Sequence, residues 1–80
     1  MTKIEYGKCE KLMEEAIRKA KQAYDNFIEA DKYSRNGNNV EQKVSQRKAD
    51  RHYGEAIGIN QALAVLGFKH DRMKELSELL

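Results

Sequence analysis

The chain has 80 residues, with 15 lysine and arginine side chains against 13 aspartate and glutamate side chains, for a formal net charge of +2. This length suits one domain, residues 1–80, near the size at which a single hydrophobic core is marginally stabilising. The mixed charge lacks the large positive excess of a dedicated nucleic-acid-binding domain. Cys9 is the only cysteine, which excludes a disulfide within the chain, and no apolar run reaches the roughly 20 residues of a membrane span. We expect a cytoplasmic protein.

The first predicted element is a long helix over about residues 3–35, in a chain that contains no proline. Thr2 and Glu5 have the spacing of a capping box at its start. Apolar residues then recur at alternating steps of three and four, as on a helix that packs along another helix. They are Tyr6, Cys9, Met13, Ala16, Ala20, Ala23, Phe27 and Ala30. The three central alanines let a neighbouring helix approach closely but supply little buried area.

The sequence Arg-Asn-Gly-Asn-Asn at 35–39 predicts a tight turn, because glycine and asparagine tolerate left-handed backbone angles. So short a connection makes the flanking helices antiparallel neighbours. The second helix, about 40–66, is polar at first and apolar on nearly every side from Tyr53 to Leu66, so we expect that half to be buried all round. Gly67 predicts the helix end, with Phe68 folding back.

A short third helix is predicted over about 71–80, with its leucines on one side. The fold class is therefore all-α: a long antiparallel hairpin plus a short C-terminal helix, assembling into a helical bundle. Because the apolar surface exceeds what one hairpin covers, we expect a homo-oligomer, preferably a dimer, with a three-helix monomer as the alternative. The residues expected at the oligomer interface are Met13, Ala16, Ala20, Tyr53, Ile57, Gly58, Leu63 and Leu76.

Two further features of the second helix bear on packing. Gly54, Gly58 and Ala62 recur at every fourth position and form a groove for close approach, favoured within the hairpin and otherwise between chains. Asn60, inside the apolar half, either fixes the register of the helices or faces solvent.

No catalytic constellation can be assembled from the sequence. His52 and His70 are the only histidines, and neither belongs to a repeated Glu-x-x-His motif of the kind that holds metals in helical bundles. Cys9 is one of the regularly spaced apolar residues of the first helix and is expected to be a small core residue. No glycine-rich phosphate loop is present. We expect no enzymatic activity, no cofactor and no metal.

The best candidate for anion binding is a basic face on the second helix. Its residues are Lys43, Arg47, Lys48 and Arg51. Such a face can contact phosphate groups, but Asp25 and Glu29 are expected across the hairpin, where they can pair with Arg47 and Arg51. A solvated, salt-bridged face is therefore the favoured interpretation.

The patterns leave two functional hypotheses. The first is a non-enzymatic protein-interaction module that self-associates through apolar helix faces and binds or inhibits another protein. The second is a small protein that binds nucleic acid or an anionic nucleotide through the basic face.

Overall fold

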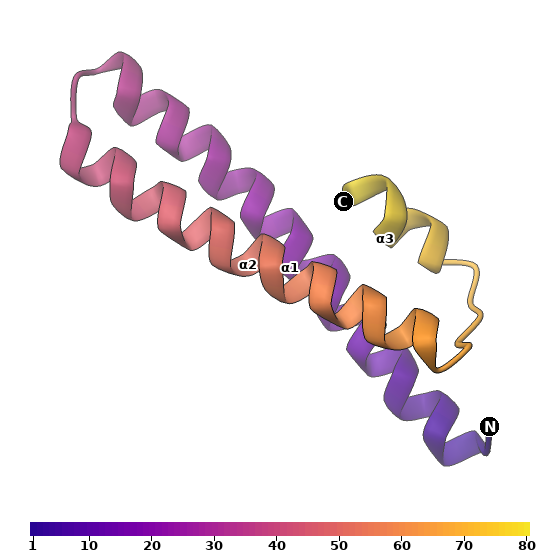
Figure 1. Cartoon of the computed structure of the whole chain (residues 1–80). Helices are drawn as coiled ribbons and strands as arrows, with labels where there is room; N and C mark the ends of the chain where they lie inside the picture. The colour runs from indigo at the N-terminus through magenta and orange to yellow at the C-terminus, as the bar shows by residue number, and fades with distance from the viewer.

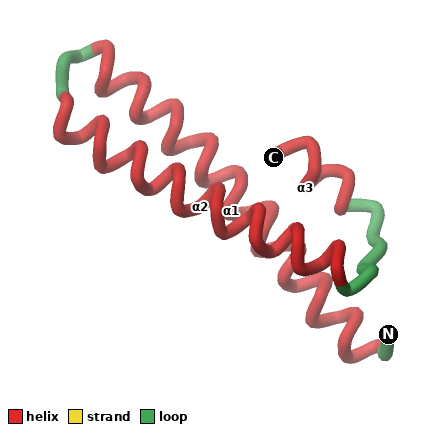
Figure 2. Tube along the Cα trace, in the orientation of Figure 1, coloured by secondary structure: helices red, strands yellow, loops and turns green.

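The computed structural model describes residues 1–80 as three helices: α1 (Lys3–Arg35), α2 (Asn39–Val65) and α3 (Met73–Leu79). α1 and α2 form a long antiparallel hairpin, and α3 folds back beside one end of it (Figure 1). Figure 2 shows that the connections are the tight turn at one end and a longer segment before α3. The molecule is a rod of 52 × 17 × 16 Å. The predicted all-α hairpin with a short C-terminal helix is confirmed.

The helix ends follow the local signals in the sequence. The Thr2 hydroxyl accepts from the backbone N–H of Glu5 at 3.1 Å, and the Glu5 carboxylate accepts from the Thr2 N–H, which completes the capping box. At the turn, Gly37 has φ +72° and the Asn38 N–H donates to the Tyr33 carbonyl at 2.9 Å, satisfying a carbonyl of the last turn of α1. The Asn38 side chain then caps α2.

The end of α2 uses the same backbone arrangement. Gly67 has φ +72°, and the Phe68 N–H donates to the Leu63 carbonyl at 3.0 Å. This hydrogen bond turns Phe68 back toward the helix, where its side chain is buried in the core with Leu63. The predicted glycine stop and the return of Phe68 are both confirmed.

The contact between α1 and α2 is lined by small side chains. Ala16, Ala20 and Ala56 are almost completely buried between the helices. Lys19 of α1 pairs with Glu55 of α2, which fixes the antiparallel register of the two helices. Because alanine adds little bulk, the two backbones can lie close together along this seam.

The larger core side chains lie at the end of the rod that α3 covers. Met13, Leu63 and Leu76, one from each helix, have no exposed surface. The turn end has a different character, since its buried residues include only Ala30, Ser45 and similarly small side chains. The hydrophobic core is therefore concentrated where three helices meet.

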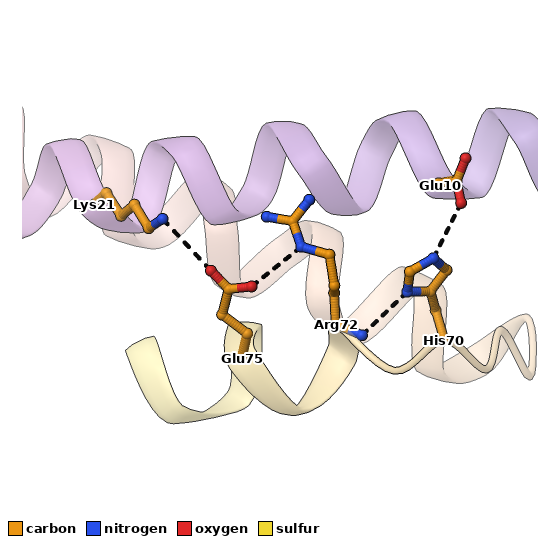
Figure 3. Close-up of polar contacts among 5 residues, drawn as sticks. All are labelled: Glu10, Lys21, His70, Arg72 and Glu75. Carbon is orange, nitrogen blue, oxygen red and sulfur yellow. Dashed lines mark hydrogen bonds and ion pairs between the residues drawn. The ribbon is translucent and has the colours of Figure 1, made fainter.

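A polar clamp attaches the segment before α3 to α1 (Figure 3). His70 Nδ1 accepts the backbone N–H of Arg72 at 3.0 Å, so the neutral ring carries its proton on Nε2 and donates to Glu10, also at 3.0 Å. The ring also stacks on Phe68, with centroids 5.9 Å apart, and Phe68 contacts Tyr6. His70 thereby fixes the path of the chain into α3.

A second polar contact lies farther along α3. Glu75 accepts from the Arg72 guanidinium at 3.1 Å and lies 3.4 Å from the Lys21 ammonium of α1 (Figure 3). The Arg72 hydrogen bond, and then Lys21, lower the pKa of the Glu75 carboxyl below its ordinary value. With the Glu10–His70 contact, this pair shows that α3 runs in the same direction as α1. The Tyr53 hydroxyl donates to the Leu80 carbonyl at 2.6 Å.

Two sequence-based expectations need correction. α3 begins at Met73 rather than near residue 71, because the His70 ring takes the Arg72 N–H and the chain before Met73 forms turns. The apolar half of α2 is not buried all round: Val65 and Leu66 remain 87% and 60% exposed. α3 lies against α1, and it therefore leaves the outer side of α2 uncovered.

The alanine seam generates a prediction for stability. Ala16→Leu places extra carbons where no space is open, and should lower the free energy of unfolding by about 1–3 kcal/mol. Urea denaturation followed by circular dichroism measures this. The control is Ala62→Leu, at an exposed position on α2, which should change stability by no more than about 0.5 kcal/mol. If both variants were equally stable, the close approach of α1 and α2 would be wrong.

Candidate functional site

The predicted basic face is exposed in the structure. Lys43, Arg47, Lys48 and Arg51 are all solvent-accessible residues of the first half of α2. Their spacing of three and four residues brings them to neighbouring positions on the helix surface. The face therefore exists as a surface feature on one helix.

The expected ion pairs across the hairpin are not formed. Neither Asp25 nor Glu29 pairs with Arg47 or Arg51, and the Arg51 guanidinium lies 4.0 Å from Glu55 on its own helix. Lys43, Arg47 and Lys48 make no ion pair. Arg51 and Glu55 are four residues apart on one helix. Their ion pair therefore restricts the side chains less than an ion pair between two helices would. The basic face is consequently less neutralised than the sequence suggested.

Glu55 is the only carboxylate that pairs with the basic face. It accepts from the Lys19 ammonium and also lies near Arg51 and His52. The Lys19 hydrogen bond, reinforced by these positive charges, lowers the pKa of the Glu55 carboxyl below its ordinary value of 4.5. Glu55 therefore stays ionised and connects α2 to α1 at neutral pH.

An open hollow of ≈ 400 Å³ lies between α1 and α2 beside this face. Its lining is entirely polar: Gln22, Asp25, Asn26, Lys48, Arg51 and His52. Sequence reasoning missed the α1 side of this hollow. The available signal was the four-residue spacing of Gln22 and Asn26, which puts two amides on one flank of α1.

The residues expected at an oligomer interface separate into two groups. Five of them are buried within the single chain: Met13, Ala16, Ala20, Leu63 and Leu76. Side chains already covered by α1, α2 and α3 offer no surface to a second copy. Tyr53 and Ile57 are half-buried and Gly58 is exposed, so these three keep accessible surface.

The small residues of α2 do not pack within the hairpin, contrary to the favoured interpretation. Gly54, Gly58 and Ala62 are exposed, and a Cβ atom added at either glycine would meet no atom within 4 Å. Their helical positions point away from the buried Ala56 and Leu63. Asn60 is half-buried and its side chain forms no hydrogen bond within the chain.

An apolar strip lies on α1 near the turn. Tyr24, Phe27 and Ile28 are 64%, 37% and 46% exposed. Positions separated by three and four residues share one side of a helix. The periodicity placed Phe27 among the residues that pack along the other helix, but the structure leaves all three side chains of the strip accessible.

The reactive side chains are dispersed. Cys9 is a buried free thiol in the core, as its seam position predicts, and His70 is engaged with Glu10. No group of three or more histidine, cysteine, aspartate or glutamate residues is placed to hold a metal ion. None of the helices combines the length and the apolar character needed to cross a membrane.

Comparison of the chain with protein-family models, with curated proteins and with solved structures gives no significant match. The surfaces of the chain are therefore the basis on which a function can be assigned.

The lowered pKa of Glu55 predicts a pH dependence of stability. An acid whose pKa is depressed on folding stabilises the folded state above its unfolded pKa, and this contribution is lost as the pH falls. Glu55→Gln should therefore lower Tm at pH 7, and the difference from wild type should shrink as the pH falls through 4.5 and below. Thermal melts from pH 7 to pH 3 measure it.

Glu14→Gln is the matched control, because Glu14 is exposed and forms no ion pair. Its effect on Tm should be small at every pH. A Glu55→Gln effect that stayed constant down to pH 3 would contradict a stabilising ion pair with Lys19.

Proposed function

We propose that the chain is a non-enzymatic interaction module that self-associates as a dimer and binds or inhibits another protein through apolar helix faces. The apolar strip of Tyr24, Phe27 and Ile28 is the observation that carries this proposal. Large apolar side chains that lie together on an exposed helix face are typical of surfaces that meet another chain.

The strip continues the face of α1 on which α3 packs. Ile17 is buried in the core with Leu76, and Lys21 contacts Glu75 of α3. Tyr24 and Ile28 follow Ile17 and Lys21 by seven residues each, which returns them to the same side of the helix after two turns. α3 ends at Leu79, so beyond it this face has no third helix.

A second copy of the hairpin would supply the missing helices. Two turn ends placed strip to strip form a four-helix arrangement in which each copy presents the same surface to the other. The turn end has the least buried volume of its own, so it gains most from such a contact. This surface replaces the five core residues in the predicted interface.

Another exposed apolar surface would remain for a different protein. Val65 and Leu66 project from the opposite end of α2, where they are 87% and 60% exposed. A dimer through the α1 strip does not use them. The proposal therefore assigns self-association to the turn end and binding of a second protein to the end of α2.

The dimer predicts a mass near twice the 9.3 kDa of the chain at micromolar concentration. Analytical ultracentrifugation of wild type, Ile28→Glu and Val65→Glu tests the surface. Ile28→Glu places a charge in the strip and should weaken dimerisation at least about tenfold, whereas Val65→Glu, the same change at the other end, should leave it intact. A wild-type chain that stayed monomeric at 100 μM (on the order of ten times a typical weak-dimer Kd) would rule the dimer out.

A second candidate function is the binding of nucleic acid or an anionic nucleotide. It is favoured by the absence of ion pairs at Lys43, Arg47 and Lys48. Cations without carboxylate partners are free to replace the counterions of a phosphate backbone. Their positions on one helix allow them to contact a single strand or groove together.

This candidate predicts binding to DNA or RNA that weakens steeply with salt. The triple variant Lys43/Arg47/Arg51→Ala should reduce the slope of log affinity against log salt concentration by about 2–3. The control Lys3/Lys8/Lys11→Ala removes the same charge from exposed positions on α1 and should retain more affinity. Fluorescence anisotropy with a labelled oligonucleotide measures both. Equal losses in the two variants would indicate nonspecific charge attraction.

A further inference from the structure

The hollow between α1 and α2 contains hydrogen-bond donors that have no acceptor within the chain. Gln22 and Asn26 are half-buried on α1, and their side-chain amides form no hydrogen bond. Both amides keep contact with solvent in the open hollow, so they are free to donate to a ligand. Across from them, Lys48 of α2 has no ion-pair partner, and Arg51 only approaches Glu55 at 4.0 Å.

His52 adds an unsatisfied group at the same place. It lines the hollow from α2, and its Nδ1 atom is buried without a hydrogen-bond partner. The hollow thus combines two amides without a hydrogen-bond partner, a lysine without an ion-pair partner, Arg51 and an imidazole ring. Asp25 is the single carboxylate in the lining, and it opposes a negatively charged ligand.

The lining selects the chemistry of the ligand. All six lining side chains end in a polar or charged group, so a ligand in the hollow meets several hydrogen-bonding partners. Lysine, arginine and amide donors together suit a group with several acceptor oxygens and more than one negative charge. A phosphate group has both properties.

We propose that this hollow binds a phosphate group, with Lys48 and Arg51 providing charge and Gln22 and Asn26 donating from their amides. The proposal deepens the second candidate function and depends on it for the class of ligand. The phosphate belongs either to a small polyphosphate or to a nucleic-acid backbone, because both present the same oxygens to the hollow.

The test is an NMR titration of the ¹⁵N-labelled chain, with inorganic pyrophosphate in one arm and a short single-stranded DNA in the other. Shifts at the hollow in the first arm identify a small polyphosphate, and shifts only in the second identify a backbone. Lys48→Gln should weaken binding about tenfold and Asn26→Ala about threefold. Asp25→Asn should strengthen it about threefold, because it removes the opposing charge.

Lys43→Gln is the matched control in the pyrophosphate arm, since it makes the same charge change on α2 outside the hollow and should alter pyrophosphate affinity less than about twofold. Circular dichroism of each variant verifies that it remains folded. If neither ligand shifts the NMR resonances of the residues that line the hollow, the proposal is overturned. A different outcome would show that the basic face alone binds DNA and that the hollow does not. In that case Lys43→Gln and Lys48→Gln would weaken DNA binding equally, and Asn26→Ala and Asp25→Asn would have no effect.

Discussion

The close contact between α1 and α2 is the constraint on which the rest of the structure depends. Ala16, Ala20 and Ala56 bring the backbones together, but each removes little apolar area from water. Larger side chains must then supply the stabilisation, and they can do so only where a third element covers them. For this reason the core gathers around Met13 and Leu63 at one end, and α3 is an integral part of it despite having seven residues.

The position of α3 also determines which surfaces stay open. It occupies one flank of α1, beside Ile17 and Lys21, and that flank continues to the apolar strip near the turn. Lys19 contacts Glu55 on the other flank, which continues to the hollow by way of Asn26, seven residues farther on. The two proposed binding surfaces consequently lie on different sides of the same helix. A dimer formed through the strip leaves the hollow accessible.

The sequence predicted the parts of the fold that depend on local chemistry. The capping box at Thr2, the turn at Gly37 and the stop at Gly67 all follow from the conformational preferences of single residues. The sequence could not separate core residues from interface residues. Periodicity shows that Leu76 lies on the apolar side of its helix, but it does not show which neighbour covers that side. The hollow was not predicted for a related reason. In the sequence, Gln22 and Asn26 have the pattern of ordinary solvent-exposed positions, and only the placement of α2 beside them forms the hollow.

The uneven distribution of buried volume along the rod governs how the chain opens. Separation of the helices from the turn releases Ala30, Ser45 and Ala49, so each broken turn exposes little apolar surface. Backbone amides near the turn should therefore exchange with solvent through local opening, while those beside Met13 exchange only when the whole molecule unfolds. The turn end is thus the part of the rod that local unfolding reaches most easily. Any partner that holds α1 and α2 together there will register as slowed hydrogen exchange, whatever its chemical nature.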